Sequence, residues 1–483
     1  MKCNGTDLQR QVLVQILKVN HCTEVAKRFR LTREETAASF KSKVPLMSYE
    51  DIVTDIQCMM AGNTNILCSG GVTMYAKSSG TTNARSKYIP MSGNMHRYNH
   101  VASSWDTMAI VYKEDEDAEI FRHKSTIMGG AIEHIGAARV GDVSALLLDK
   151  MHWAGRPFFT PDFTTATMPD WPKKIEKMAS ICSEEPVVMI GGVPSWTMIL
   201  CNRILEQTGK KHMLEVWPTV KYYMHGGVGF SPYRDQFRDL FPSEDFKYYE
   251  VYNASEGYFA VQDESNGEGM LLLLDNGIYF EFVPLNDIGT DRPLALNLEE
   301  VELGKDYAIV ITTIGGLWRY VVGDTVRFTS LKPYRIMVSG RTKQYINVFG
   351  EEVMVANTDN ALAKTCSQLD VSVAEYTVAP KHMTVNESGY HHWYIEFKHD
   401  PESIKVFAEM LDLNLRRENS DYDAKRKNNM ILTPLKITVV PKGLFYKWMK
   451  SRDKYGGQHK VPRLANDDRY VKELESMIKE YYV

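Results

Sequence analysis

The feature of this sequence that most restricts its fold is a series of short apolar runs that end in glycine-rich turns. Between residues 92 and 225 these runs alternate with helical stretches, which is the pattern of a layered α/β domain. Two of the runs, 187–190 and 222–224, are typical of buried strands, and a helix that continues to residue 206 follows the first. Strands of this kind place ligands at their carboxyl ends. Ordinary strand-to-helix turns are an equal alternative for each turn taken alone.

The residues before and after this region predict further domains. A chain of 483 residues is too long for one ordinary core. Apolar periodicity predicts N-terminal helices that begin near Thr6, Thr23 and Ser48, with these residues as N-caps. From about residue 250 to 338 the pattern becomes that of antiparallel strands, with a hairpin expected around Asp275-Asn276-Gly277.

The last third of the chain has its own alternation of helices and strands. Residues 339–345 are predicted to form a linker. Earlier in the chain, Gly323-Asp324 is predicted to close a tight turn. We therefore expect an N-terminal domain over 1–340, a hinge over 341–345 and a small α+β domain over 346–483.

Composition excludes several classes of protein. The net charge of −4 and the pI near 6.4 give no electrostatic footprint for nucleic acid. The seven cysteines are scattered and form no CxxC pair, which favours reduced thiols and argues against a zinc site. The first twenty residues do not resemble a signal peptide, and no apolar run approaches the roughly 18 residues of a membrane span. We expect a cytoplasmic protein with neither a nucleic-acid nor a membrane partner.

A loop rich in hydroxyl groups follows the apolar run 72–76. Its backbone N–H groups and hydroxyls suit a polyphosphate, and a lysine adds a point charge, although no Walker-type P-loop is present. A polar surface turn is about equally consistent with this short motif. The candidate phosphate-binding residues are Ser78, Ser79, Gly80, Thr81, Thr82 and Lys87.

Three further motifs each carry a candidate ligand. In the segment 252–256, Glu256 offers a carboxylate to Mg²⁺, and the backbone beside it offers a carbonyl to an adenine amino group. Asp324, at the end of the segment 317–324, offers one carboxylate to the two hydroxyls of a ribose. Lys460 lies in a glycine-containing loop near the C-terminus. Taken alone, the segment with Glu256 is better explained as a surface turn with a solvated glutamate, and the segment with Asp324 is about equally well explained as a hairpin turn. Lys460 alone would be an ordinary exposed lysine.

The order of these four motifs resembles that of the Gretchen Hagen three (auxin-responsive) acyl-acid amido synthetases, a branch of the adenylate-forming superfamily that includes acyl-CoA synthetases and luciferases. SSGTT…K…P resembles the phosphate motif of the family, YNASEG its adenine and metal motif, WRYVVGD its ribose motif and GQHKVPR its lysine loop. The likeness covers nearly the whole chain, with weaker matches at 40–45 and 48–51. The segment from residue 339 resembles the superfamily hinge, with Lys343 at the hinge position. Trp318 and Val321 depart from the family pattern, and Asn83-Ala84 replaces a usual glycine.

The resemblance implies a large layered α/β N-terminal domain with an antiparallel β subdomain, and a small mobile α+β C-terminal lid. It implies a monomeric ligase that uses ATP and Mg²⁺ to adenylate a carboxylic acid and then transfers the acyl group to an amine, expected to be an amino acid. An acyl-CoA ligase and a non-catalytic binding protein are the alternatives, and the presence of Glu256 and Lys460 argues against the second.

The resemblance also assigns residue roles. Lys460 and Glu256 would be catalytic, with Glu256 also the metal ligand. The residues implied to hold the nucleotide are the phosphate-loop residues above with Tyr252, Ala254, Ser255, Glu256, Asp324, Arg341 and Lys343. The acyl acid is expected at the glycine-rich strand ends, among Gly129, Gly130, Val193, Pro194, Ser195, Trp196, Gly226 and Gly227.

Overall fold

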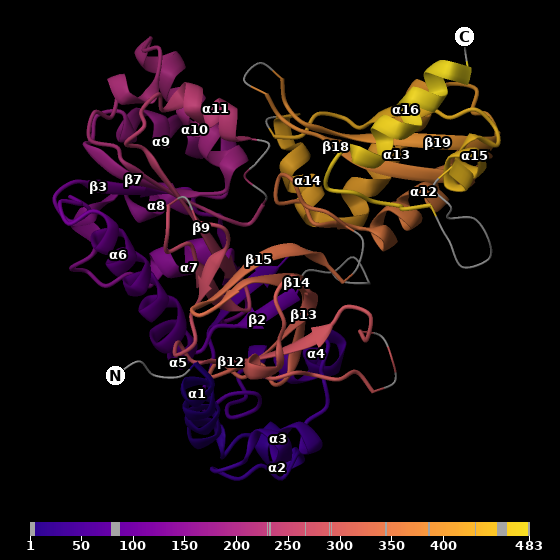
Figure 1. Cartoon of the computed structure of the whole chain (residues 1–483). Helices are drawn as coiled ribbons and strands as arrows, with labels where there is room; N and C mark the ends of the chain where they lie inside the picture. Colours follow the sequence, from indigo (N-terminus) through magenta and orange to yellow (C-terminus); the bar gives the residue numbers. More distant parts are fainter. Residues whose placement is uncertain are drawn as a thin grey trace. The chain divides into compact units, whose positions relative to one another are not determined.

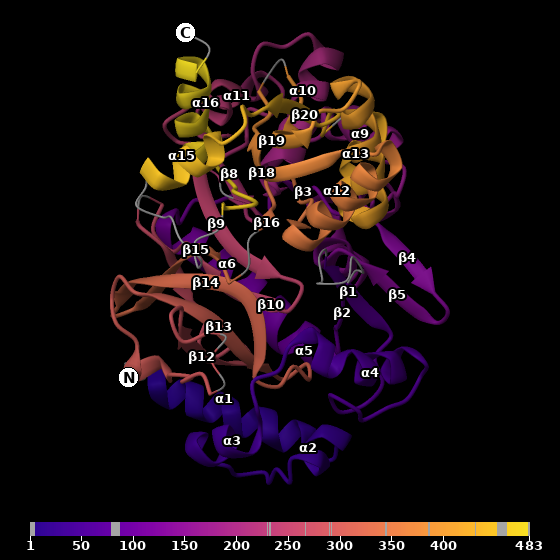
Figure 2. The same cartoon turned by 90° about the vertical axis from the view of Figure 1, so that its right-hand side faces the viewer.

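The chain forms two compact units that each combine helices and sheets, as Figures 1 and 2 show. The computed structural model describes residues 5–78, 87–228, 230, 233–265, 267–288, 290, 292–342, 345–384, 387–429, 431–451 and 461–481. The first unit comprises the described residues within 1–78, 87–227 and 237–342, and the second those within 228–236 and 343–483. The predicted mixed α/β class is confirmed.

A large sheet runs through the first unit and is parallel in one half and antiparallel in the other. The described part of this sheet has 11 strands, and strand β9 joins its two halves because it runs parallel to β8 and antiparallel to β10. The parallel half has the order β6 (Phe159–Thr160), β3 (Lys124–Ile127), β7 (Val187–Gly192), β8 (Tyr222–His225) and β9 (Lys247–Ala254). The antiparallel half continues with β10 (Gly257–Val261), β11 (Met270–Leu272), β15 (Tyr334–Arg341), β14 (Tyr320–Leu331), β13 (Asp306–Thr313) and β12 (Ile278–Pro284).

Helices cover both faces of the parallel strands. Helices α9 (Trp171–Cys182) and α10 (Pro194–Thr208) lie on one face and α6 (Ala102–Glu114) on the other (Figures 1 and 2). The first four residues of β7 are all buried, as expected for a parallel strand covered on both sides. Further helices in this unit are α5 (Gly93–Met95), the π-helix His96–Val101, α7 (Val143–Asp149) and α8 (Phe163–Ala166).

A second sheet in the same unit holds the ends of the predicted phosphate loop. Its order is β2 (Lys87–Pro90), β1 (Met74–Ser78), β5 (Ala138–Gly141) and β4 (Ile132–Ile135). Strands β1 and β2 pair antiparallel, with Ser78 opposite Lys87. The loop therefore connects two paired strands, which the sequence pattern did not predict. Residues 79–86 lie outside the described part of the chain.

The N-terminal helices pack on the antiparallel half of the large sheet. Helix α1 (Gly5–Asn20) is fastened by Gln9, whose amide group donates to the Leu274 and Ile278 carbonyls at 2.7 and 2.9 Å and accepts from the Phe280 N–H at 2.7 Å. Thr6 was expected to cap this helix, but helical geometry extends to Gly5, so that prediction is wrong.

The other two predicted caps are correct. Thr23 accepts a bond from the Ala26 N–H at the start of α2 (Glu24–Arg28). Ser48 precedes α4 (Tyr49–Met60), and Asp51 accepts from its N–H at 2.7 Å. Helix α3 (Ala37–Lys43) lies between these two helices in the sequence.

Two of the predicted turns are not formed. Strand β11 pairs with β10 and β15, and β12 pairs with β13, so the expected hairpin around Asp275-Asn276-Gly277 is absent from the described strands. Tertiary contacts override the local signal here, because the Asn276 side chain donates to Ser103 and Asp106 on α6. Gly323-Asp324 also closes no turn: both residues lie within β14, paired with the end of β15.

The second unit is a small α+β body. Its three-stranded sheet has the order β18 (Ser372–Lys381), β19 (Tyr390–His399) and β20 (Lys436–Val439), and a short ladder joins β16 (Tyr345–Ile346) to β17 (Val353–Met354). The helices are α12 (Val355–Leu369), α13 (Ile404–Glu418), α14 (Ser420–Arg426), α15 (Leu444–Ser451) and α16 (Arg469–Tyr481), while α11 (Arg234–Leu240) begins in residues of this unit. Trp448 and Leu474 anchor α15 and α16 in one buried cluster. Within the described residues, no helix has the length and apolar character needed to span a bilayer.

Candidate active site

Lys87 stands at one end of the predicted phosphate loop, opposite Ser78 at the other. Its ammonium group donates to the Tyr320 hydroxyl at 3.4 Å and lies 5.9 and 6.0 Å from the ring centroids of Tyr49 and Tyr320. Cation–π attraction to two rings holds the charge beside the loop. Ser79, Gly80, Thr81 and Thr82 lie outside the described residues.

The predicted adenine and metal motif lies at the junction of the two halves of the large sheet. Tyr252 and Ala254 are in β9, and Ser255 and Glu256 form the turn into β10. Gly257 follows this turn in a close-packed position, because a Cβ there would lie 2.7 Å from Ile278 Cδ1.

Glu256 is a buried carboxylate in this turn. It is only 6% exposed. Burial and then the Glu256 charge raise the pKa of Tyr320 well above its usual value. For Tyr252, burial and Asp324 are the larger causes of a raised pKa, and Glu256 adds to them. Both tyrosines therefore remain protonated donors near neutral pH.

The predicted ribose residue Asp324 is held from two sides. The Tyr252 hydroxyl donates to Asp324 Oδ2 at 2.6 Å, and Arg341 Nε forms an ion pair with Oδ1 at 2.6 Å. Arg341 is the residue paired with Asp324 between β14 and β15. Gly323 precedes it with φ of +99°, in the left-handed region that favours glycine. The structure thus brings three of the predicted nucleotide residues into direct contact.

A buried ion pair fixes the strand that carries Asp324. The Arg319 guanidinium binds both oxygens of Glu281 and also donates to the Lys41 and Val44 carbonyls at 3.1 and 2.7 Å. Met47 then pairs with Tyr320, accepting from the Val321 N–H at 2.9 Å. The segment at 40–47 is therefore attached to the start of β14, beside Tyr320.

The residues predicted to bind the acyl acid lie at the adjacent carboxyl ends of β3, β7 and β8. The Met128 N–H, just before Gly129 and Gly130, donates to the Gly191 carbonyl at 2.8 Å. Gly192 pairs with His225, which precedes Gly226, and a Cβ on Gly227 would lie 3.4 Å from Val193 Cγ2. The first turn of α10 is largely enclosed: Pro194 and Trp196 are buried, and Ser195 is fully buried.

Sequence reasoning missed a buried lysine in this region. The Lys174 ammonium group, on α9, donates to the carbonyls of Gly129 and Gly130 and lies 5.4 Å from the Trp171 ring centroid. Trp171 in turn packs edge-on against Trp196 at 5.1 Å. No local signal marks Lys174, because a lysine beside Lys173 on an amphipathic helix reads as solvated. Sequence reasoning also did not single out Tyr49 and Tyr320, although they lie in the segments 48–51 and 317–324 named above.

In the second unit, the predicted residues Lys343 and Lys460 lie outside the described part of the chain. Arg463, three residues after Lys460, is described. Its backbone carbonyl accepts from the Val378 N–H at 2.9 Å, and its guanidinium donates to the Tyr376 carbonyl at 3.0 Å and pairs with Glu375. Strand β18 therefore anchors the chain that emerges from the lysine loop.

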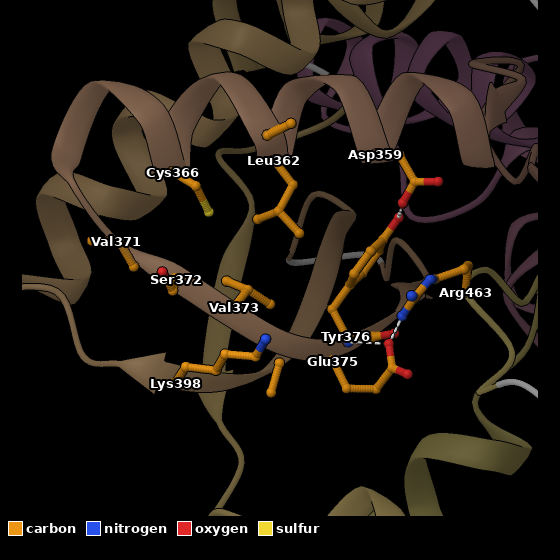
Figure 3. Close-up of a pocket in the computed structure, with 12 residues that line it drawn as sticks. Asp359, Leu362, Cys366, Val371, Ser372, Val373, Glu375, Tyr376, Lys398 and Arg463 are labelled. Atoms are coloured by element: carbon orange, nitrogen blue, oxygen red, sulfur yellow. Dashed lines mark hydrogen bonds and ion pairs between the residues drawn. The ribbon is translucent and has the colours of Figure 1, made fainter.

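A cavity of about 410 Å³ lies beside this anchor, between α12 and β18. Figure 3 shows Tyr376 between two of the charged residues that line it: the Tyr376 hydroxyl donates to Asp359 at 2.7 Å, and Arg463 lies near the ring. Cys366 and Val373 line the other end, together with Leu362, Ala363, Val371, Ser372, Ala374 and Lys398.

The fold is that of the adenylate-forming enzymes. The structure resembles a solved acyl acid amido synthetase, AtGH3.15 in complex with 2,4-DB, with a TM-score of 0.60 and 19% identity over 97% of this chain and 93% of that chain. It also resembles 2-hydroxyisobutyryl-CoA ligase in complex with 2-HIB-AMP and CoA, with a TM-score of 0.54 and 14% identity over 98% of this chain and 92% of that chain.

Sequence comparison identifies the family. The GH3 family N-terminal domain matches residues 1–130 and 133–246, the central domain 271–341 and the C-terminal domain 356–469. This chain belongs to the GH3 family. It is 24% identical to the indole-3-acetic acid-amido synthetase GH3.4 of Arabidopsis thaliana, over 98% of this chain and 92% of the relative. It is 22% identical to the 4-substituted benzoates-glutamate ligase GH3.12 of the same species, over 98% and 95%.

Proposed function

We propose that this protein is an ATP-dependent acyl-acid amido synthetase. A carboxylate oxygen of the acid attacks the α-phosphorus of ATP and expels pyrophosphate, which gives an acyl-adenylate. The amino group of an amino acid then attacks the acyl carbon, loses a proton and expels AMP. Membership of the GH3 family supports this proposal, because relatives along the whole chain are named as amido synthetases and an amino-acid ligase.

In this proposal the nucleotide lies along the neighbouring ends of β1, β2, β9 and β14. The hydroxyl-rich loop and Lys87 bind its phosphates, and the backbone of 252–255 binds adenine. Asp324 and Arg341 bind the ribose. Both chemical steps then depend mainly on positioning and charge stabilisation.

Mg²⁺ is proposed to accompany ATP, with Glu256 as its protein ligand. Magnesium keeps several waters and is usually bound by one or two carboxylates with substrate phosphates. Glu256, a buried acid in the turn that directly follows Ala254 of β9, fits this requirement. The ion would neutralise charge on the phosphates when bound.

The acyl acid is proposed to bind at the carboxyl ends of β3, β7 and β8. Lys460 would neutralise charge that develops on the α-phosphate, and the chain around Lys343 would act as the hinge that reorients the C-terminal domain between the two steps.

One observation carries the nucleotide assignment: residues of three motifs that are far apart in sequence, Tyr252, Asp324 and Arg341, meet in one contact network. The test is ATP–pyrophosphate exchange with a panel of aromatic, indolic and fatty acids. The best acid is then incubated with amino acids or with CoA as acceptor. Acid-dependent exchange followed by amide formation is expected. Thioester formation alone would make the protein an acyl-CoA ligase, and the absence of exchange with every acid would refute the ligase assignment.

A further inference from the structure

The Asp324 carboxylate has part of its hydrogen-bonding capacity already in use. A carboxylate offers about four lone-pair sites, two on each oxygen. The Tyr252 hydroxyl occupies one site on Oδ2, whereas Arg341 Nε forms an ion pair with Oδ1 at 2.6 Å. Each oxygen therefore keeps at least one site for a further donor. Two adjacent hydroxyl groups, one for each oxygen, match that remaining capacity.

The two partners also restrict the orientation of the carboxylate. Both contacts are 2.6 Å long. The Tyr252 contact is a hydrogen bond to an ionised group, which is of the stronger class, and the Arg341 contact is an ion pair. The Tyr252 ring cannot readily move, because it packs edge-on against Phe259 at 4.8 Å and is almost fully buried. On the opposite side, Arg341 is held in register with Asp324 by the pairing of β14 with β15.

The end of β15 is itself fastened beside Asp324. The backbone N–H and the hydroxyl of Thr342 both donate to the Gly323 carbonyl, at 2.9 and 3.2 Å. The Arg341–Asp324 pair is therefore flanked on one side by this attachment and on the other by the rest of the β14–β15 ladder. Tyr252 supplies the remaining constraint from β9.

We infer that Tyr252 is a positioning residue that, with Arg341, orients the Asp324 carboxylate to accept hydrogen bonds from the vicinal diol of a nucleotide ribose. The inference rests on the proposed nucleotide site, and it assigns the tyrosine hydroxyl a role through Asp324. A ribose that lacks its 2′-hydroxyl leaves one Asp324 oxygen without the donor that the ribose would supply. The tyrosine hydroxyl thus contributes to discrimination between ribonucleotide and deoxyribonucleotide.

The test measures dissociation constants for MgATP and Mg-2′-deoxyATP by titration calorimetry, which needs no acid substrate. The wild-type protein is expected to prefer ATP by tenfold or more, because a site built to bind a hydroxyl rejects an analogue that lacks it. Tyr252→Phe keeps the ring and removes the hydroxyl. We expect it to reduce the ATP preference at least fivefold.

Tyr249→Phe is the matched control. Tyr249 lies on the same strand, and its hydroxyl also donates to a carboxylate, Glu114 Oε2, at 2.7 Å. This variant should keep the wild-type preference, which separates the effect of Tyr252 from a general loss of a buried hydrogen bond.

Asp324→Asn provides a second readout. If Tyr252 acts through Asp324, the double variant should show no further loss of ATP preference beyond that of Asp324→Asn alone. The inference is overturned if Tyr252→Phe binds ATP and 2′-deoxyATP with the wild-type ratio, if the two substitutions reduce the ratio independently, or if the wild-type protein binds neither nucleotide. Failure of pyrophosphate exchange with retained ribose discrimination would instead refute the ligase assignment alone.

Discussion

The buried pair between Arg319 and Glu281 gives a quantitative test of how β14, the strand that carries Asp324, is held in place. Arg319→Met keeps most of the side-chain volume and removes the charge. It leaves the Glu281 carboxylate, which is 0% exposed, without its three guanidinium bonds of 3.2, 2.9 and 2.8 Å. The Val44 carbonyl also loses a donor at 2.7 Å.

The magnitude follows from this burial. Removing one partner of a buried ion pair costs about 3–5 kcal/mol, because the other charge is left uncompensated. Lys41 Nζ remains 3.7 Å from Glu281 and offsets part of this loss. We therefore expect Arg319→Met to lower the free energy of unfolding by about 3 kcal/mol. The double variant Arg319→Met/Glu281→Met removes both charges and should cost about 1–2 kcal/mol, since replacing both partners by apolar groups is often close to neutral.

The assay is urea denaturation followed by tryptophan fluorescence. The control is Arg327→Met, because the Arg327 guanidinium also donates to both carboxylate oxygens of its partner, Asp306, at 3.0 and 2.7 Å, but with side chains that are 43% and 28% exposed. Exposed pairs contribute about 0–1 kcal/mol. Equal effects of Arg319→Met and Arg327→Met, or additive effects of the two Arg319 and Glu281 substitutions, would show that burial does not decide the energy of this pair.

Three further substitutions test the proposed metal ligand, the pH dependence of stability and the proposed hinge. Glu256→Gln keeps the shape of the proposed metal ligand and removes its charge, so adenylation should need about tenfold more Mg²⁺ for half-maximal rate; superimposable Mg²⁺ titrations would exclude Glu256 as a ligand. His100→Gln tests pH dependence: burial lowers the pKa of His100 to about 3, whereas the unfolded value is about 6.5. Below about pH 6.5 the unfolded chain therefore gains a proton that the folded chain does not. As the pH is lowered, the free energy of unfolding should decrease by up to about 1.4 kcal/mol per pH unit. The variant should lose that slope between pH 6 and 4.5 in chemical denaturation, and parallel curves would contradict the assignment. Lys343→Pro, which restricts the backbone of the expected hinge, should slow consumption of acyl-AMP by an amine ~100-fold, about 2.7 kcal/mol, and leave acyl-AMP formation within about tenfold. Single-turnover measurement of the two steps decides this, and equal loss in both, or loss in neither, would reject the hinge.

Several elements were predictable because their signals are local. The caps at Thr23 and Ser48 depend on side chains that bond to a backbone or side-chain group three residues away. Strand β7 and helix α10 follow from an apolar run, a glycine pair and a proline within ten residues. The order of the four motifs was likewise sufficient to predict the family and the mixed α/β class.

Other elements could not be predicted, because they depend on which segments become neighbours. Asp275-Asn276-Gly277 carries a strong hairpin signal, yet β11 and β12 take other partners in the large sheet. Gly323 has the positive φ of a turn residue but lies within a strand.

The sequence by itself determined the residue types available to the proposed site: a carboxylate in the proposed adenine and metal motif, another in the proposed ribose motif, and a hydroxyl-rich loop with a lysine. Only the tertiary structure decided that the Tyr252 hydroxyl meets Asp324, 72 positions away, and that Lys174 is buried against two glycine carbonyls. The physical reason is that local propensity acts over a few residues, whereas sheet order and the burial of charge are set by the packing of the whole unit.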